Sequence, residues 1–202
     1  MSTAIWDRIE DARGDWNVLC HPFYERWSAG ELTLGELARY SGQYRHAVGA
    51  IATMSSAAAA AAPDRPELAR HAEEERAHLR LWEGFVAAVG GTVDDEPTRE
   101  TAECVSSWTA DRDLLPILAK LYAIESGQPA ISRTKREGLR AFYGIEDGAG
   151  TAYFNVHETR DADHAADARA LIEELADEAD GDELVAAATG AFQANWRLLD
   201  GV

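Results

Sequence analysis

The sequence has few of the residues that bind nucleic acid or cross a membrane. Only 19 residues are Lys or Arg against 36 Asp or Glu, which gives a formal net charge of -17. Such a charge repels phosphate backbones and anionic lipid surfaces. The most apolar tract, residues 57–62, falls far short of the run of about 20 apolar residues that a membrane span needs. We therefore expect neither a nucleic-acid partner nor a membrane partner.

Cysteine and lysine are also scarce. Cys20 and Cys104 have no CxxC spacing, so we expect free thiols in a reducing compartment. The first residues lack the basic and apolar regions of a secretory signal, which predicts a cytoplasmic protein. The only lysines are Lys120 and Lys135. Low lysine together with a large acidic excess predicts a halophilic protein, whose self-repulsion is screened by high salt.

The chain favours a single all-α domain over residues 1–202. Its length suits one core, and 46% of its residues are hydrophobic. Apolar residues recur at helical spacing nearly everywhere, and no alternating run predicts a strand. We expect an antiparallel bundle of seven or eight helices. The expected helices span about 3–12, 22–29, 34–62, 67–89, 99–109, 114–127 with a continuation past Pro129 to 143, 151–177 and 182–199.

Helix-capping signals support these boundaries. Thr33 and Glu36 form the pattern of a capping box, and Asp113 can cap the helix that follows it. Gly90 and Gly91 are suited to ending a helix. Pro129 is expected to bend or restart the helix that contains it.

The strongest chemical signal is the pattern His157-x3-Asp161-x2-His164. Offsets of four and seven residues place these side chains on one face of a helix. Two imidazoles and a carboxylate suit iron or manganese. The alternative is a solvated face of a charged helix. The chain has only six histidines, which favours the metal site.

A second cluster occupies residues 71–78. Glu74 lies one turn before His78, and Glu75 lies three residues before it. Glu-x-x-His pairs of this kind bind metal inside carboxylate-bridged helical bundles. The alternative is again a water-exposed run of charges. The apolar residues Leu79, Trp82 and Phe85 follow, so His78 should lie close to the core.

Glu125 lies in a mostly apolar segment, where an unpaired carboxylate would be costly to bury. A metal ion would be a suitable partner. Three helices can thus supply three carboxylates and three imidazoles, which is enough for two metal ions. The candidate ligands are Glu74 or Glu75, His78, Glu125, His157, Asp161 and His164.

Over nearly its whole length the chain resembles the haem-oxygenase-like dinuclear metal oxidases, and most closely their CADD-like branch, related to the PqqC and TenA proteins. The resemblance rests on residues 21–30, on the segments 73–75 and 78–85, on 121–125, and on the His157, Asp161 and His164 pattern. The first of these segments is shared with metal-free relatives. The final pattern together with Glu125 is more specific.

The resemblance implies the same ligand set, with one departure. Family members commonly have six residues between the first glutamate and the histidine of this helix. Here that position is His71, and the acidic triplet stands closer to His78. This leaves Glu74 as the preferred first carboxylate, with Glu75 as the alternative.

The resemblance also implies a function. In the CADD-like branch the protein is thought to make para-aminobenzoate for folate-type cofactors by consuming its own side chains. A tyrosine supplies the ring and a lysine is implicated as the source of the amine. Tyr24 matches the first tyrosine, Tyr40 a second, and Lys135 the lysine. The cofactors would be two metal ions, Fe/Fe or Mn/Fe, with dioxygen and a reductant as partners. Relatives are often dimers, which implies a homodimer.

Simpler readings remain for these three residues. Tyr24 and Tyr40 could be ordinary core tyrosines, and Lys135 could be a surface residue between two arginines. An amine donor at Lys135 must be neutral, so its pKa should be lowered by burial or by the nearby metals. The aromatic residue that often precedes the family's glutamate is Ile124 here.

Two other functions stay open. The first is a dinuclear iron oxidase that acts on a free amino acid or fatty acid. The second is a metal-free TenA- or PqqC-like protein that binds a small molecule. Metal analysis separates the second from the other readings.

Overall fold

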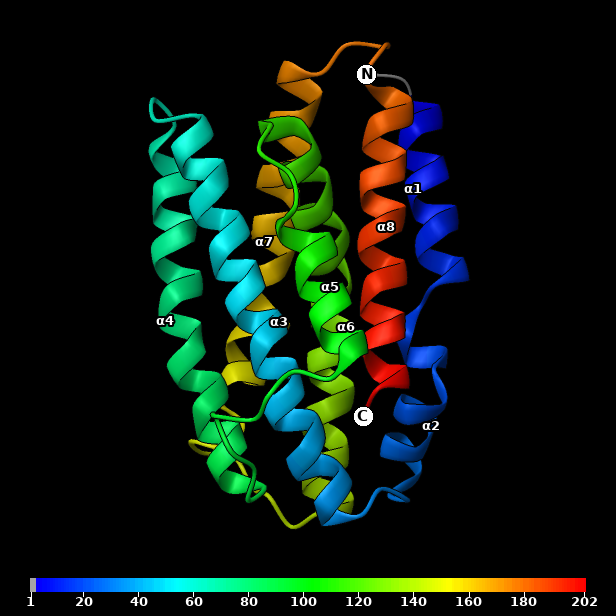
Figure 1. Cartoon of the computed structure of the whole chain (residues 1–202), viewed down its shortest axis with the longest axis vertical. Helices are drawn as coiled ribbons and strands as arrows, with labels where there is room; N and C mark the ends of the chain where they lie inside the picture. Colours follow the sequence, from blue (N-terminus) through cyan, green and yellow to red (C-terminus); the bar gives the residue numbers. More distant parts are fainter. Residues whose placement is uncertain (1–2) are drawn as a thin grey trace.

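A computed structural model describes residues 3–202, and all regular structure in this range is helical. The long helices run side by side along a common axis, with the short helix α2 near one end (Figure 1). In order they are α1 (Thr3–Asp15), α2 (Pro22–Ala29), α3 (Leu34–Ala61), α4 (Pro66–Ala88), α5 (Arg99–Thr109), α6 (Leu114–Phe142), α7 (Ala152–Leu175) and α8 (Gly181–Asp200). The predicted all-α bundle of seven or eight helices is confirmed for the described residues.

The ends of the helices follow local chemistry. The Thr33 hydroxyl accepts a hydrogen bond from the Glu36 N–H, and the Glu36 carboxylate accepts one from the Thr33 N–H, so the predicted capping box is confirmed. Gly30 and Gly90 end α2 and α4 with φ values of 71° and 72°, a left-handed conformation that glycine adopts without steric cost.

The structure differs from the local expectations at three places. The N-cap residue Asp113 makes no side-chain capping hydrogen bond. Residues 18–20 form a 3₁₀ helix, η1 (Val18–Cys20), that the sequence did not signal. Pro129 lies inside one helix, α6, which is assigned without interruption through residue 142. Because α6 packs against α2, α3, α7 and α8, tertiary contacts there outweigh the hydrogen bond that a proline removes.

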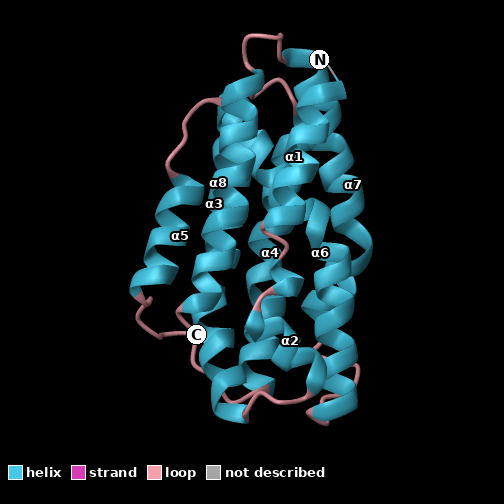
Figure 2. Cartoon of the chain, turned by 90° about the vertical axis from the view of Figure 1, so that its right-hand side faces the viewer, coloured by secondary structure: helices cyan, strands magenta, loops and turns pink. Residues whose placement is uncertain are grey.

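The core is rich in aromatic side chains. Trp27, Trp82 and Trp108 are fully buried, and Tyr24, Tyr40 and Tyr44 lie with them. Seen from the side, the loops gather mostly at the two ends of the bundle, so its middle is helix packed on helix (Figure 2). None of the helices in the described range is both long and apolar enough to cross a membrane.

Candidate metal centre

Helix α4 presents three metal-ligating side chains to the interior. His71, Glu75 and His78 are spaced by four and three residues, which places them on one face of the helix. Glu75 and His78 are buried, and the His71 side chain is 12% exposed. The water-exposed alternative is therefore wrong for this face of α4.

Helix α7 presents a matching set. His157, Asp161 and His164 are all buried, so the solvated-face alternative is wrong for them as well. Glu125, from the middle of α6, completes the cluster and is also buried. The three helices predicted to supply ligands therefore do converge.

The two histidine pairs face each other across α4 and α7. The ring centroids of His71 and His164 lie 4.2 Å apart, and those of His78 and His157 lie 4.5 Å apart. Residue numbers rise along α4 as they fall along α7, so the two helices are antiparallel at the site. Each end of the cluster therefore has one imidazole from each helix.

Glu75 lies between the two pairs. Its Oε1 is 3.0 Å from His78 Nδ1, 3.8 Å from His71 Nε2 and 4.0 Å from His164 Nδ1. Two groups of ligand atoms, each within 4.8 Å of one another, both include Glu75. One is formed by His71, Glu75, Glu125 and His164, and the other by Glu75, His78 and His157. A carboxylate shared in this way can bridge two metal ions.

The cluster leaves buried polar atoms without hydrogen-bond partners. They are Glu75 Oε2, Glu125 Oε2, His157 Nε2 and His164 Nδ1, whereas His71 Nε2 pairs with Glu125 Oε1 at 2.9 Å. Each such atom costs free energy unless something binds it. Neutral imidazole nitrogens and carboxylate oxygens are the donors that iron and manganese accept. The donor set therefore fits a pair of these ions.

Burial shifts the pKa values of the cluster. It lowers the pKa of His157 to about 3, which keeps the imidazole neutral, and with the help of Glu75 it raises the pKa of Asp161 to about 8. Burial also raises the pKa of Glu125. At His71 burial acts to lower the pKa, but the Glu125 carboxylate outweighs it and raises the pKa to about 9. Bound cations would favour the deprotonated form of each group.

Asp161 also orients a ligand. Its Oδ1 lies 2.8 Å from His157 Nδ1. With Asp161 ionised, the form that bound cations favour, the ring donates from Nδ1 and Nε2 is left for a metal ion. Carboxylates commonly fix metal-binding histidines in this way. Asp161 Oδ1 is 3.9 Å from His164 Nδ1, so this carboxylate is within reach of the cluster too.

The structure separates the two alternatives for the first carboxylate. The Glu75 side chain is 2% exposed and central, whereas the preferred Glu74 is 33% exposed and lies at the edge. Glu74 Oε2 is 3.1 Å from His164 Nε2 and 3.9 Å from Arg160 Nη1, and belongs to neither group of converging atoms. The geometry therefore favours Glu75 as the ligand.

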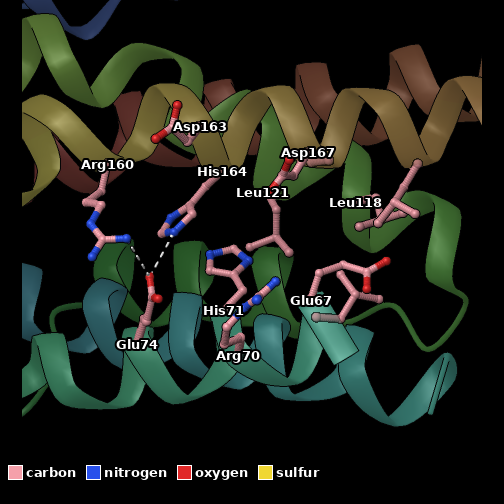
Figure 3. Close-up of a pocket in the computed structure, with 13 residues that line it drawn as sticks. Glu67, Arg70, His71, Glu74, Leu118, Leu121, Arg160, Asp163, His164 and Asp167 are labelled. Atoms are coloured by element: carbon pink, nitrogen blue, oxygen red, sulfur yellow. Dashed lines mark hydrogen bonds and ion pairs between the residues drawn. The ribbon is translucent and has the colours of Figure 1, made fainter. Parts of the chain in front are cut away.

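A cavity of about 340 Å³ opens beside the cluster. His71 and His164 point toward each other in it, and Glu74 reaches toward Arg160 and His164 at its edge (Figure 3). Leu118 and Leu121 from α6 form part of its wall. A small molecule could therefore approach the His71 end of the cluster.

A second set of buried residues surrounds Lys135 on α6. This lysine is 0% exposed, so the surface alternative is wrong, and its amine has no hydrogen-bond partner. Burial lowers its pKa to about 7, as an amine donor would require. The amine lies 5.8 Å from the Tyr24 ring centroid and 5.4 Å from that of Tyr40. The hydroxyl oxygens of Tyr24 and Tyr40 are 3.2 Å apart.

Several residues around Lys135 were not singled out from the sequence. The amine lies 4.6 Å from the ring centroid of Tyr44, 5.3 Å from Trp82 and 5.4 Å from Phe154. The Tyr153 ring lies between the residues around Lys135 and the candidate metal ligands. Its centroid is 3.8 Å from the ring centroid of His157 and 4.9 Å from that of Trp82. Aromatic residues at helical spacing look like core, so no sequence signal distinguished them.

His71 is the candidate ligand that sequence reasoning noticed but did not select. A signal for it was present, because His71-x3-Glu75-x2-His78 repeats the spacing of the α7 pattern. The family resemblance, which expects a carboxylate at this place, directed attention to the acidic triplet and to Glu74 instead.

The fold and the buried imidazole–carboxylate cluster together define a haem-oxygenase-like helical protein with a candidate metal centre. The model of the family described as iron-containing redox enzymes matches residues 67–196, and this chain belongs to that family. A 4-aminobenzoate synthase from Chlamydia muridarum is 30% identical to it over 99% of this chain and 90% of its own length.

Solved structures share the fold at low sequence identity. A CADD-like protein of unknown function from Nostoc punctiforme has a TM-score of 0.77 at 17% identity, covering 96% of this chain and 94% of its own. A TenA homologue from P. horikoshii has a TM-score of 0.76 at 15% identity, covering 98% and 99%. These likenesses confirm the haem-oxygenase-like fold.

Proposed function

We propose that this protein is an oxygen-dependent dinuclear metal oxygenase that makes para-aminobenzoate from its own Tyr24, with nitrogen from Lys135. One observation carries the proposal. A buried amine without a hydrogen-bond partner lies against the Tyr24 and Tyr40 rings, in the same core as a buried imidazole–carboxylate cluster. The similarity to a 4-aminobenzoate synthase supports the proposed product.

The predicted ligands Glu75, His78, Glu125, His157, Asp161 and His164 would hold two metal ions, Fe/Fe or Mn/Fe. Such ions, when bound, activate dioxygen with electrons from a reductant. The protein keeps the ligands out of bulk water, and Asp161 holds the His157 ring in one orientation.

The chain's own residues supply the rest of the chemistry. Tyr24 and Tyr40 share a hydrogen bond, so a proton that leaves one phenol has an acceptor in the other. With a pKa of about 7, roughly half of the Lys135 amines are neutral near pH 7 and have a free electron pair. The surrounding rings exclude water from the amine. The family resemblance assigns the loss of the ring to Tyr24, with Tyr40 beside it.

Isotope labelling tests this proposal sharply, because the chain has only two lysines. Protein made with lysine carrying ¹⁵N at Nε is supplied with iron, manganese, reductant and dioxygen. The expected product is ¹⁵N-labelled para-aminobenzoate, with mass lost from the peptides that contain Tyr24 and Lys135. Unlabelled product from intact protein would contradict the proposal.

Lys135→Met is the matching variant, because methionine has a similar shape and no amine. It should bind metal normally and release no product. Arginine is a poorer choice at this position, since it would bury a permanent charge with no partner.

The cavity at the His71 end supports one alternative, an oxidase acting on a free amino acid or fatty acid. Arg70 and Arg160 line the cavity and could bind a substrate carboxylate. This alternative requires that turnover depend on added substrate and that Tyr24→Phe only alter the rate. Turnover without substrate, abolished by Tyr24→Phe, would exclude it.

A further inference from the structure

Helices α4 and α7 carry the same arrangement of ligand residues. Each has a histidine, an acidic residue four positions later and a second histidine three positions after that. The helices are antiparallel at the site, so the first histidine of one faces the last histidine of the other. The two carboxylates, Glu75 and Asp161, occupy the middle of each pattern. The cluster therefore has an approximate two-fold arrangement.

His71 is the member of this arrangement that lies outside the proposed ligand set. Its Nε2 lies 2.9 Å from Glu125 Oε1 and 3.8 Å from Glu75 Oε1, within one of the two groups of converging atoms. Its nearest partner is therefore the Glu125 carboxylate, which is itself a candidate ligand. His78, its counterpart on the other side of Glu75 along α4, has the equivalent position relative to His157.

Resting on the dinuclear centre of the proposed function, we propose that His71 is itself a metal ligand. One metal position then takes His71 and His164, and the other takes His78 and His157. Glu75 belongs to both positions, and Glu125 lies at the first. The cluster has four imidazoles and three carboxylates, with Glu74 outside it.

This ligand set has a consequence for metal choice. The family resemblance leads us to expect a carboxylate at residue 71. With an imidazole there instead, the site has one negative charge fewer and one oxygen donor fewer. Carboxylates suit manganese, whereas imidazoles suit iron. The His71 position should therefore favour iron over manganese more strongly than a carboxylate at the same place would.

Cobalt(II) substitution followed by proton NMR counts the ligands directly. A coordinated neutral imidazole retains one N–H, which gives a hyperfine-shifted signal that disappears in D₂O. Four such signals are expected in the native sequence. His71→Ala and His71→Glu should each give three. His46→Ala is the matched control and should still give four, because His46 contacts the Asp95 carbonyl away from the cluster. Glu74→Gln should also give four.

The outcomes separate this inference from the proposed function. Three signals in the native protein, unchanged in His71→Ala, would overturn the role of His71 and leave the dinuclear centre intact. Absence of cobalt binding in the native protein would refute both. If His71→Ala binds no metal, His71→Glu decides: three signals support the inference and four overturn it.

When iron and manganese are supplied together, His71→Glu should hold a larger share of manganese, and an unchanged ratio would overturn the proposed selectivity.

Discussion

At the residue scale, the least usual feature of the core is the unpartnered amine of Lys135. It lies among five aromatic rings, with no acceptor for its N–H groups. An unsatisfied polar group in such a place destabilises the fold. Its retention is easier to understand if the amine is needed for chemistry, which is the role proposed for it.

Lys135→Met should therefore stabilise the protein at pH 7, by about 1–3 kcal/mol in the free energy of unfolding, because it removes an unsatisfied buried group. Urea denaturation measures this change. A lower unfolding midpoint in the variant would show that contacts between the amine and the rings stabilise the fold.

The pH dependence of the free energy of unfolding tests the lowered pKa of Lys135. The pKa of Lys135 is about 7 in the folded protein against an ordinary value of 10.5, so between these values the unfolded chain binds more protons. The contribution of Lys135 to stability therefore rises with pH across this window. The difference in stability between Lys135→Met and the native protein should shrink as pH rises from 7 to 10. A constant difference would contradict the lowered pKa.

At the element scale, the position of Lys135 depends on how α2 packs against α6. The Trp27 indole donates a hydrogen bond to the Lys135 carbonyl at 3.2 Å, and the same ring lies directly over Gly138. A Cβ at Gly138 would lie 2.6 Å from Trp27 Cδ1. Glycine is therefore required here for the close approach of the two helices.

Gly138→Ala should destabilise the protein by about 1–3 kcal/mol, as overpacking of a core does. Gly127→Ala is the matched control in the same helix, because a Cβ there would meet only Ile131 at 3.5 Å. That control should be neutral or stabilising by about 0.5–1 kcal/mol, since alanine favours helix more than glycine does. Thermal unfolding followed by circular dichroism measures both, and equal effects would contradict the packing described.

Helix boundaries and most candidate ligands could be predicted from the sequence because they depend on local spacing. The α7 pattern and Glu125 were found in this way. The choice between Glu74 and Glu75 could not be made, since both lie within one turn of His78 and only the packing of α4 shows which one faces inward. His71 repeats the α7 spacing, but its contacts with Glu125 and His164, which make it a candidate ligand, come from α6 and α7 and are not local. The continuity of α6 through Pro129 likewise depends on its neighbours.

At the scale of the whole molecule, the net charge of -17 is the dominant electrostatic feature. Acidic self-repulsion opposes the compact state, and dissolved salt screens it. The halophilic character, the cytoplasmic location and the homodimer stay predictions.

The charge gives a direct prediction for stability. The urea midpoint should rise as potassium chloride is raised from low concentration into the molar range, and protein unfolded at low salt should refold at high salt. Circular dichroism follows both transitions. A midpoint that does not change with salt would refute the halophilic prediction.

The proposed centre would hold two metal ions between the buried imidazoles and carboxylates of α4, α6 and α7. Anomalous X-ray diffraction at the iron and manganese edges, on crystals of protein produced with ample supplies of both metals, tests it most directly. Two peaks are expected in each chain, one between His71 and His164 and one between His78 and His157, both beside Glu75, and His157→Ala should lose them. Crystals of the native protein without an anomalous peak at either position would contradict the account.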